Sequence, residues 1–137
     1  MKALIVGCGR VGSALAKALL ESGWEVSALD ESEEALGRLG ERWPGHFHLG
    51  HALDTAVLER AGIENADALI VATSGDNTNI VVAQVAKLRY EVPAVAVRIL
   101  DPARAEFYSN RGFDVVSPTS AAIASLTDWA SKLKATA

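Results

Sequence analysis

Apolar residues along the chain follow two alternating periods. Short, nearly continuous apolar runs at residues 3–6, 25–29, 47–49, 68–72, 94–99 and 113–116 are typical of buried β-strands. Between these runs, residues 10–21, 32–42, 55–61, 78–89 and 103–111 carry apolar side chains at the three-and-four spacing of amphipathic helices. The pattern therefore predicts six strands joined by five crossover helices.

A helix that joins two strands returns the chain to the same end of the sheet, so the strands must run parallel, with right-handed crossovers. We predict an α/β fold, a Rossmann-type doubly wound six-stranded parallel sheet. No linker, repeat or low-complexity stretch interrupts the pattern. The chain should form a single domain over residues 1–137, with a Rossmann core at 1–117 and a C-terminal helix at 118–137.

The C-terminal helix carries one apolar stripe, which should be buried against another surface. Two alternatives stay open: the stripe packs on its own sheet, or it docks on another subunit. Trp129 near the chain end favours a dimer. The stripe consists of Ala122, Ile123, Leu126, Trp129, Ala130 and Leu133.

Composition and charge limit the kinds of partner and the cellular compartment that are expected for this chain. Half of the residues are hydrophobic and the formal net charge is −4, with no run of Lys or Arg, so nucleic acid is not expected. No apolar run approaches the ~20 residues of a membrane span. The single Cys8 excludes an internal disulfide, and Met1 leads into the first strand without the order of a signal peptide. We expect a cytoplasmic protein without direct membrane insertion.

A glycine-rich segment follows the first predicted strand and opens the first helix. This context is the one that a dinucleotide-binding fingerprint requires: one glycine for the tight turn, one for close approach of the pyrophosphate, and one for helix–strand contact. Unpaired N–H groups at the helix start would face the phosphates. The segment reads Gly7, Cys8, Gly9, Arg10, Val11, Gly12.

Asp30 ends the second predicted strand, where a carboxylate can accept hydrogen bonds from both ribose hydroxyls. A 2′-phosphate beside Asp30 and Glu31 would meet two negative charges, and no Arg follows within the next few positions. An adenosine with a free 2′-hydroxyl is therefore expected, and NADP is disfavoured.

Several further segments strengthen one family resemblance. The chain resembles, nearly end to end, the N-terminal, TrkA-N type domain of the RCK family, the regulators of potassium conductance found in Trk and Ktr potassium uptake systems. The segments that carry the resemblance are the glycine loop, Asp30, residues 50–54, 58–63, 66–68 and 73–79, Arg98, and residues 112–118.

The resemblance implies a cytosolic, non-enzymatic regulatory subunit that binds NAD(H) or ATP/ADP, forms dimers and rings, and gates a membrane potassium-translocating subunit. It would then lie at the inner face of the plasma membrane only through that partner. The C-terminal helix would cross to the partner subunit. The implied contacts are Arg10 with phosphates, Asp30 with ribose, His51 and Ala52 with the base, and Thr73, Ser74, Gly75 and Asn77 in the loop that closes over the ligand.

Two positions depart from the family. His51 stands where the family usually has Asp, which changes the contact with the base. Thr119 stands where many members carry a Glu that helps hold a metal-nucleotide, which weakens metal-assisted sensing of ATP. The family's regulators also commonly continue into a smaller C-terminal ligand domain.

Other residues have more than one interpretation. His46, His48 and His51 could hold zinc, but no Cys or carboxylate is fixed nearby in sequence, so no metal site is predicted. Cys8 is either a thiol activated by the helix start or a small residue between glycines. Arg98 reaches a phosphate, pairs across an interface, or forms a surface salt bridge. Asp54 should cap the following helix rather than work with Glu59 in acid–base chemistry.

Three functional hypotheses follow. The first is the nucleotide-sensing regulatory subunit. The second is the cofactor domain of an NAD-dependent dehydrogenase, which lacks here a substrate domain and a convincing acid–base pair. The third is an assembly module without a ligand. We favour the first, with no catalytic residues.

Overall fold

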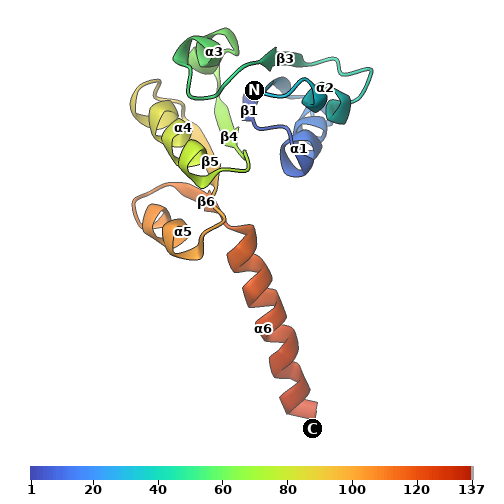
Figure 1. The fold of residues 1–137 in the computed structure, drawn as a ribbon, viewed down its shortest axis with the longest axis vertical. Coiled ribbons are helices and arrows are strands. Elements are labelled where there is room, and N and C mark those ends of the chain that lie inside the picture. The colour runs from blue at the N-terminus through green and yellow to red at the C-terminus, as the bar shows by residue number, and fades with distance from the viewer. Residues whose placement is uncertain (137) are drawn as a thin grey trace.

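The predicted parallel sheet is confirmed. The structure is a computed structural model, and it describes residues 1–136. Six strands form one parallel sheet in the order β3-β2-β1-β4-β5-β6 (Figure 1). Their bounds are Lys2–Val6 (β1), Glu25–Asp30 (β2), His46–Leu49 (β3), Ala68–Val71 (β4), Ala94–Arg98 (β5) and Asp114–Val116 (β6).

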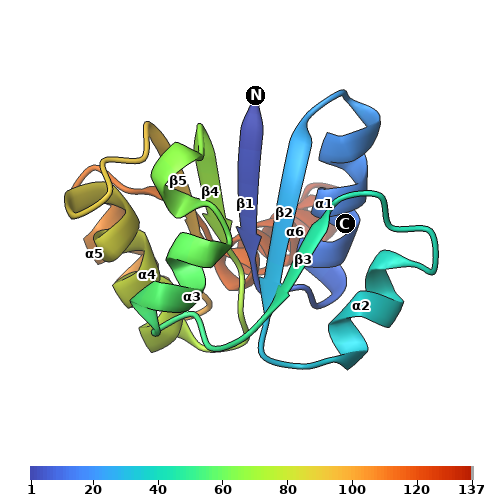
Figure 2. The same ribbon diagram turned by 90° about the horizontal axis from the view of Figure 1, so that it is seen from above.

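Helices cover both faces of the sheet (Figure 2). Apolar residues of α1 and α2 pack on one face with Ala3 and Ile5, and those of α3, α4 and α5 pack on the other with Leu4 and Val6. Successive residues of β1 thus face opposite cores, as the strand period of two requires. The helices are Arg10–Glu21 (α1), Glu34–Leu39 (α2), Thr55–Arg60 (α3), Asp76–Leu88 (α4), Pro102–Ser109 (α5) and Pro118–Thr136 (α6), with a 3₁₀ turn at Ile63–Asn65 (η1).

The element bounds agree with the predicted ones within two residues, except at the end of α2. This helix stops at Leu39, three residues early, because Gly40 takes a left-handed φ of 102° and Pro44 follows soon after. As predicted, Asp54 caps α3, since its carboxylate accepts a hydrogen bond from the Ala56 N–H at 3.0 Å.

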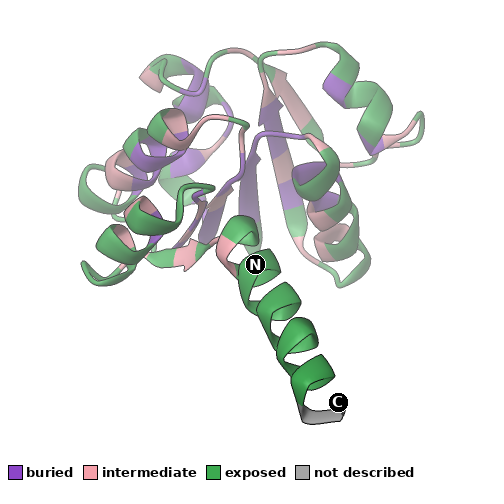
Figure 3. Cartoon of the chain, turned by 60° about the horizontal axis from the view of Figure 1, so that its bottom comes forward, coloured by how far each residue is buried: buried purple, intermediate pink, exposed green. Residues whose placement is uncertain are grey.

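The interpretation that α6 packs on its own sheet is wrong. The helix projects away from the sheet (Figure 1), and its side chains are exposed almost throughout (Figure 3). Ile123, Leu126 and Trp129 expose 54%, 67% and 62% of their surface. Ser117 alone separates the edge strand β6 from the start of α6 at Pro118. The apolar stripe has no cover within the described part of one chain.

The sheet also fixes where a ligand can bind. The chain order reverses between β1 and β4, whose crossovers leave to opposite sides. A crevice opens at such a switch point beyond the carboxyl ends of the strands. Within the described residues, no helix is both long and apolar enough to cross a membrane.

Candidate functional site

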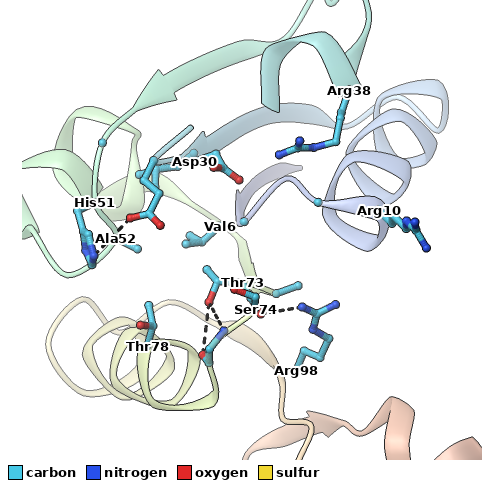
Figure 4. A pocket seen from close by; sticks show the side chains of 17 residues that line it. Val6, Arg10, Asp30, Arg38, His51, Ala52, Thr73, Ser74, Thr78 and Arg98 are labelled. Atoms are coloured by element: carbon cyan, nitrogen blue, oxygen red, sulfur yellow. Dashed lines mark hydrogen bonds and ion pairs between the residues drawn. The ribbon is translucent and has the colours of Figure 1, made fainter. Parts of the chain in front are cut away.

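A pocket of about 550 Å³ occupies this switch point (Figure 4). Its volume lies within the roughly 300–1,000 Å³ of small-molecule sites. The ends of β1, β2, β4 and β5, the loops that follow β1, β2, β3 and β4, and α2 supply its walls. The lining residues are Val6, Gly7, Gly9, Arg10, Leu29, Asp30, Glu31, Arg38, Gly50, His51, Ala52, Ala72, Thr73, Ser74, Gly75, Thr78 and Arg98.

The three glycines of the loop have different structural duties. Gly7 has a left-handed φ of 93°, and a Cβ there would lie 2.7 Å from the Thr73 nitrogen. A Cβ on Gly12 would overlap the Gly7 carbonyl oxygen. A Cβ on Gly9 would meet nothing within 4 Å, so this glycine keeps open the surface where α1 begins. The first N–H groups of a helix lack intrahelical partners and favour an anion at this place.

Asp30 ties the end of β2 to the glycine loop. One carboxylate oxygen accepts from the Cys8 N–H at 2.8 Å, and the other accepts from the Ser32 N–H at 2.9 Å. Each oxygen of a carboxylate has further accepting capacity. Asp30 is therefore held in one orientation while it can still accept ribose hydroxyls.

Cys8 is a small buried residue rather than an activated thiol. Burial raises the pKa of the Cys8 thiol to about 12, and the nearby charge of Asp30 acts in the same direction. The thiol donates weakly to the Leu29 carbonyl oxygen at 3.8 Å. The helix start does not activate this cysteine.

Arg38 is a site residue that the sequence analysis missed. Its Nε donates to the Cys8 carbonyl oxygen at 2.7 Å, so Asp30 and Arg38 hold the Cys8 N–H and C=O respectively. Figure 4 places the Arg38 guanidinium over the pocket, whereas the Arg10 side chain points away from it. Arg38 lies in α2, eight positions after Asp30. The sequence analysis considered an Arg only within the few positions that follow Asp30 and Glu31. The sequence shows only that Arg38 is a basic residue in the helix after Asp30, and the contact itself depends on how α2 packs.

Buried Asn79 organises the loop after β4. Its Oδ1 accepts from the Thr73 N–H at 3.0 Å, and its Nδ2 donates to the carbonyl oxygens of Thr73 and Arg98. Arg98 in turn donates from Nη2 to the Thr73 carbonyl oxygen at 2.7 Å. The ends of β4 and β5 are thus joined at the pocket wall.

Arg98 has one unused polar atom. Its Nε is shielded from solvent and has no hydrogen-bond partner among the described residues. Arg98 forms no ion pair within the described part of the chain, so the interpretation as a surface salt bridge is wrong. The side chain lines the pocket instead.

His51 and Glu31 meet across the opening on the β2 side. The His51 Nε2 lies 3.5 Å from a Glu31 carboxylate oxygen, and its Nδ1 accepts from the Leu53 N–H at 3.2 Å. Both side chains are exposed. This pair borders the region beside Asp30 where ribose and base were expected.

Four predicted site residues do not line the pocket. Cys8 is buried beneath the loop, Val11 is exposed on α1, and Gly12 packs against Gly7. Asn77 points elsewhere, because its amide oxygen accepts from the Arg104 Nη2 at 2.8 Å. Besides Arg38, the pocket gains Thr78 at the start of α4 and the strand-end residues Val6, Leu29 and Ala72.

The three histidines do not meet at this pocket. His46 and His48 lie on β3, whereas His51 lies at the pocket. Among the described residues, no group of three or more His, Cys, Asp or Glu side chains could hold a metal ion. Glu59 accepts a hydrogen bond from the Tyr90 hydroxyl at 2.7 Å, whereas Asp54 accepts from the Ala56 N–H, so the two carboxylates make separate contacts.

A parallel sheet in this order, with a glycine turn after its first strand and an acidic residue ending its second, defines a Rossmann-like domain. Members of this class bind nucleotides in the crevice at the switch point. Residues 3–118 match the family model of the TrkA-N domain. The chain belongs to the TrkA-N domain family.

Relatives by sequence carry a common name. The chain is 44% identical over 117 residues to the Trk system potassium uptake protein TrkA of Streptomyces coelicolor, covering 85% of this chain and 52% of the relative. It is 30% identical over 131 residues to TrkA of Mycobacterium tuberculosis, covering 95% and 59%. The chain thus spans about half the length of the curated relatives that it matches.

Solved structures confirm the fold. The TrkA-N domain of the inner membrane protein ybaL from Escherichia coli superposes with a TM-score of 0.81 at 24% identity, covering 93% of this chain and 95% of that one. GsuK bound to ADP gives a TM-score of 0.77 at 25% identity, covering 93% and 33%.

Proposed function

We propose that this chain is a nucleotide-binding regulatory domain of a potassium uptake system. The observation that carries the proposal is the switch-point pocket, in which Asp30 accepts from the Cys8 N–H and Arg38 donates to the Cys8 carbonyl oxygen, beside the open surface of Gly9. The family membership and the TrkA relatives support the assignment to potassium transport.

The ligand that fits this pocket is an adenine nucleotide, NAD(H) or ATP/ADP. Asp30 accepts the ribose hydroxyls, the start of α1 faces phosphate, and His51 and Ala52 border the base. A structure with this fold, GsuK, has been solved with ADP. NADP is disfavoured because Asp30 and Glu31 put two carboxylates at the ribose end, which the single guanidinium of Arg38 offsets only in part.

The partners are a second copy of the chain and a membrane potassium-translocating subunit. The exposed stripe of Ile123, Leu126 and Trp129 on α6 is an apolar surface that a second copy would cover. The domain would then act at the cytoplasmic side of the membrane, through its transporter rather than by insertion.

We propose no catalytic role for the pocket. The close acid–base pair that the described residues place there, His51 and Glu31, borders the ribose end rather than the phosphate end and is exposed to solvent. Regulation requires only that a nucleotide bind two arrangements of the oligomer with different affinity.

Sedimentation velocity of the chain with NAD, NADH, ATP or ADP tests the regulatory part. At least two of these nucleotides should give different sedimentation coefficients or association constants, because a switch needs ligands that favour different states. The proposal fails if all four leave both quantities unchanged at saturating concentration.

A further inference from the structure

A second cleft lies at the opposite end of the sheet from the nucleotide pocket. It has a volume of about 250 Å³ and is formed by the amino ends of β1, β2 and β3 and by the turn between α3 and η1. Nothing in the proposed nucleotide function uses it. Its polar lining includes Lys2, Ser27, His46, His48, Arg60 and Asn65.

Strand register puts three of these side chains on one face of the sheet. Ser27 lies opposite His46 and Leu29 lies opposite His48, and residues two apart on a strand share a face. Leu29 packs in the same core cluster as Val57 and Leu58 of α3. The hydroxyl and both imidazoles therefore belong to the face that α3 covers.

Ser27 supplies a buried polar atom without a partner. Its hydroxyl oxygen is shielded from solvent and makes no hydrogen bond within the described residues. Such a group costs free energy unless something satisfies it, so each case calls for a physical explanation. Ser27 lines the cleft, so rotation about its Cα–Cβ bond would let the hydroxyl donate to a ligand oxygen there.

The charges of the cleft favour an anion. Arg60 ends α3, and its guanidinium forms no hydrogen bond or ion pair with any described residue. Lys2 lies opposite Glu25, the one carboxylate of the lining. Desolvation, with the nearby His46 and Arg60, holds the pKa of His48 below its ordinary value, and a bound anion would raise it again.

We propose that this cleft binds a small oxyanion, either inorganic phosphate or the phosphate group of a small metabolite. Arg60, His46 and His48 contact the oxygens, and Ser27 donates a hydrogen bond. The cleft is smaller than the roughly 300–1,000 Å³ of drug-sized sites, so a whole nucleotide does not fit. The site is independent of the nucleotide pocket.

Titration of the full chain with inorganic phosphate, and separately with glycerol 3-phosphate, tests the proposal by NMR of the histidine rings. His51 lies in the nucleotide pocket and reports binding there, whereas His46 and His48 report the cleft. We expect saturable shifts of the His46 and His48 rings and a rise in the pKa of His48. Tighter binding of one compound tells free phosphate from a phosphorylated metabolite.

Matched variants complete the test. Arg60→Gln should weaken binding about tenfold, because it removes a charged donor, whereas Arg111→Gln, between α5 and the edge strand β6 at the other side of the molecule, should leave the affinity unchanged. Ser27→Ala should weaken binding without lowering the free energy of unfolding, since the hydroxyl has no partner to lose. The proposal is overturned if neither compound shifts the two rings saturably, or if Arg60→Gln and Arg111→Gln bind alike.

Discussion

At the residue scale, the glycine loop separates residues that build the turn from residues that serve the ligand. Gly7 and Gly12 are required by neighbouring backbone, whereas Gly9 faces open space. Asp30 and Arg38 fix the two successive peptide groups that flank the Cys8 Cα. The glycine spacing predicted three separate roles, and the structure adds which atoms approach each Cα.

A pair of alanine substitutions distinguishes these roles. Gly12→Ala should lower the free energy of unfolding by about 3 kcal/mol or more, because its Cβ overlaps backbone that cannot move away. Gly9→Ala should cost no more than about 1 kcal/mol, yet weaken nucleotide binding about tenfold or more. Chemical denaturation and calorimetric titration measure the two effects. Equal destabilisation by both variants would contradict the assignment.

Asn79 and Arg38 mark the limit of sequence reasoning at this scale. Asn79 contacts Thr73, six positions earlier, and the Arg98 carbonyl, nineteen positions later. Arg38 reaches a peptide thirty positions before it. Such contacts depend on how α2 and α4 pack on the sheet, which residue spacing alone does not determine.

At the element scale, hydrophobic periodicity predicted all six strands and the five helices between them. The predicted end of α2 was wrong, because Gly40, with its positive φ, stops the helix although the apolar pattern continues.

A contact between the start of α4 and the loop after β5 was not predicted. The Asp76 carboxylate accepts hydrogen bonds from the N–H groups of Leu100 and Asp101, at 2.7 and 3.0 Å.

This contact predicts a specific dependence of stability on pH. Desolvation would raise the pKa of Asp76, but the hydrogen bonds from Leu100 and Asp101, with Arg104 and Arg98, hold it below the ordinary 3.8. Because the folded pKa is lowered, the stabilisation is present above pH 3.8 and is lost as the pH falls through the folded pKa. Asp76→Asn should cost about 1 kcal/mol at neutral pH, and its deficit should shrink in acid.

Urea denaturation of the wild type and Asp76→Asn across this range measures the effect. Asp128→Asn on α6 controls for the loss of one surface charge. The Asp128 carboxylate forms an ion pair with the exposed Lys132. A deficit of Asp76→Asn that stays constant down to the lowest pH would contradict the role of the ionised carboxylate.

At the scale of the whole molecule, the domain is a sheet with a layer of helices on each face, and α6 projects away from these layers (Figures 1 and 2). The sequence predicted the α6 stripe but left two covers open, because an apolar helix face looks the same whether its partner is intramolecular or not. The exposed helix removes the first alternative. The stripe therefore has no cover within the described part of the chain.

The stripe predicts the oligomeric state. The chain should be a dimer in solution, and Trp129→Glu should make it a monomer by placing a charge in the apolar contact. Ala124→Glu, at an exposed position that the helical period places on the opposite face of α6, should leave the dimer intact. Light scattering after size exclusion gives the masses. A monomeric wild type, or a dimeric Trp129→Glu, would contradict the proposed interface.

The central claim is that the switch-point pocket binds an adenine nucleotide through Asp30. Calorimetric titration of the wild type, Asp30→Ala and Asp67→Ala with NAD, NADH, ATP, ADP and NADP tests it most directly. Asp67 also accepts a backbone hydrogen bond, from the Lys2 N–H at 2.7 Å, so its variant controls for loss of a carboxylate at the far end of the sheet.

We predict saturable binding of NAD(H) or of ATP and ADP, weaker binding of NADP, and at least about a tenfold loss in Asp30→Ala but not in Asp67→Ala. If none of the five nucleotides binds the folded wild type, or if Asp30→Ala binds as tightly as the wild type, the account of this pocket is contradicted.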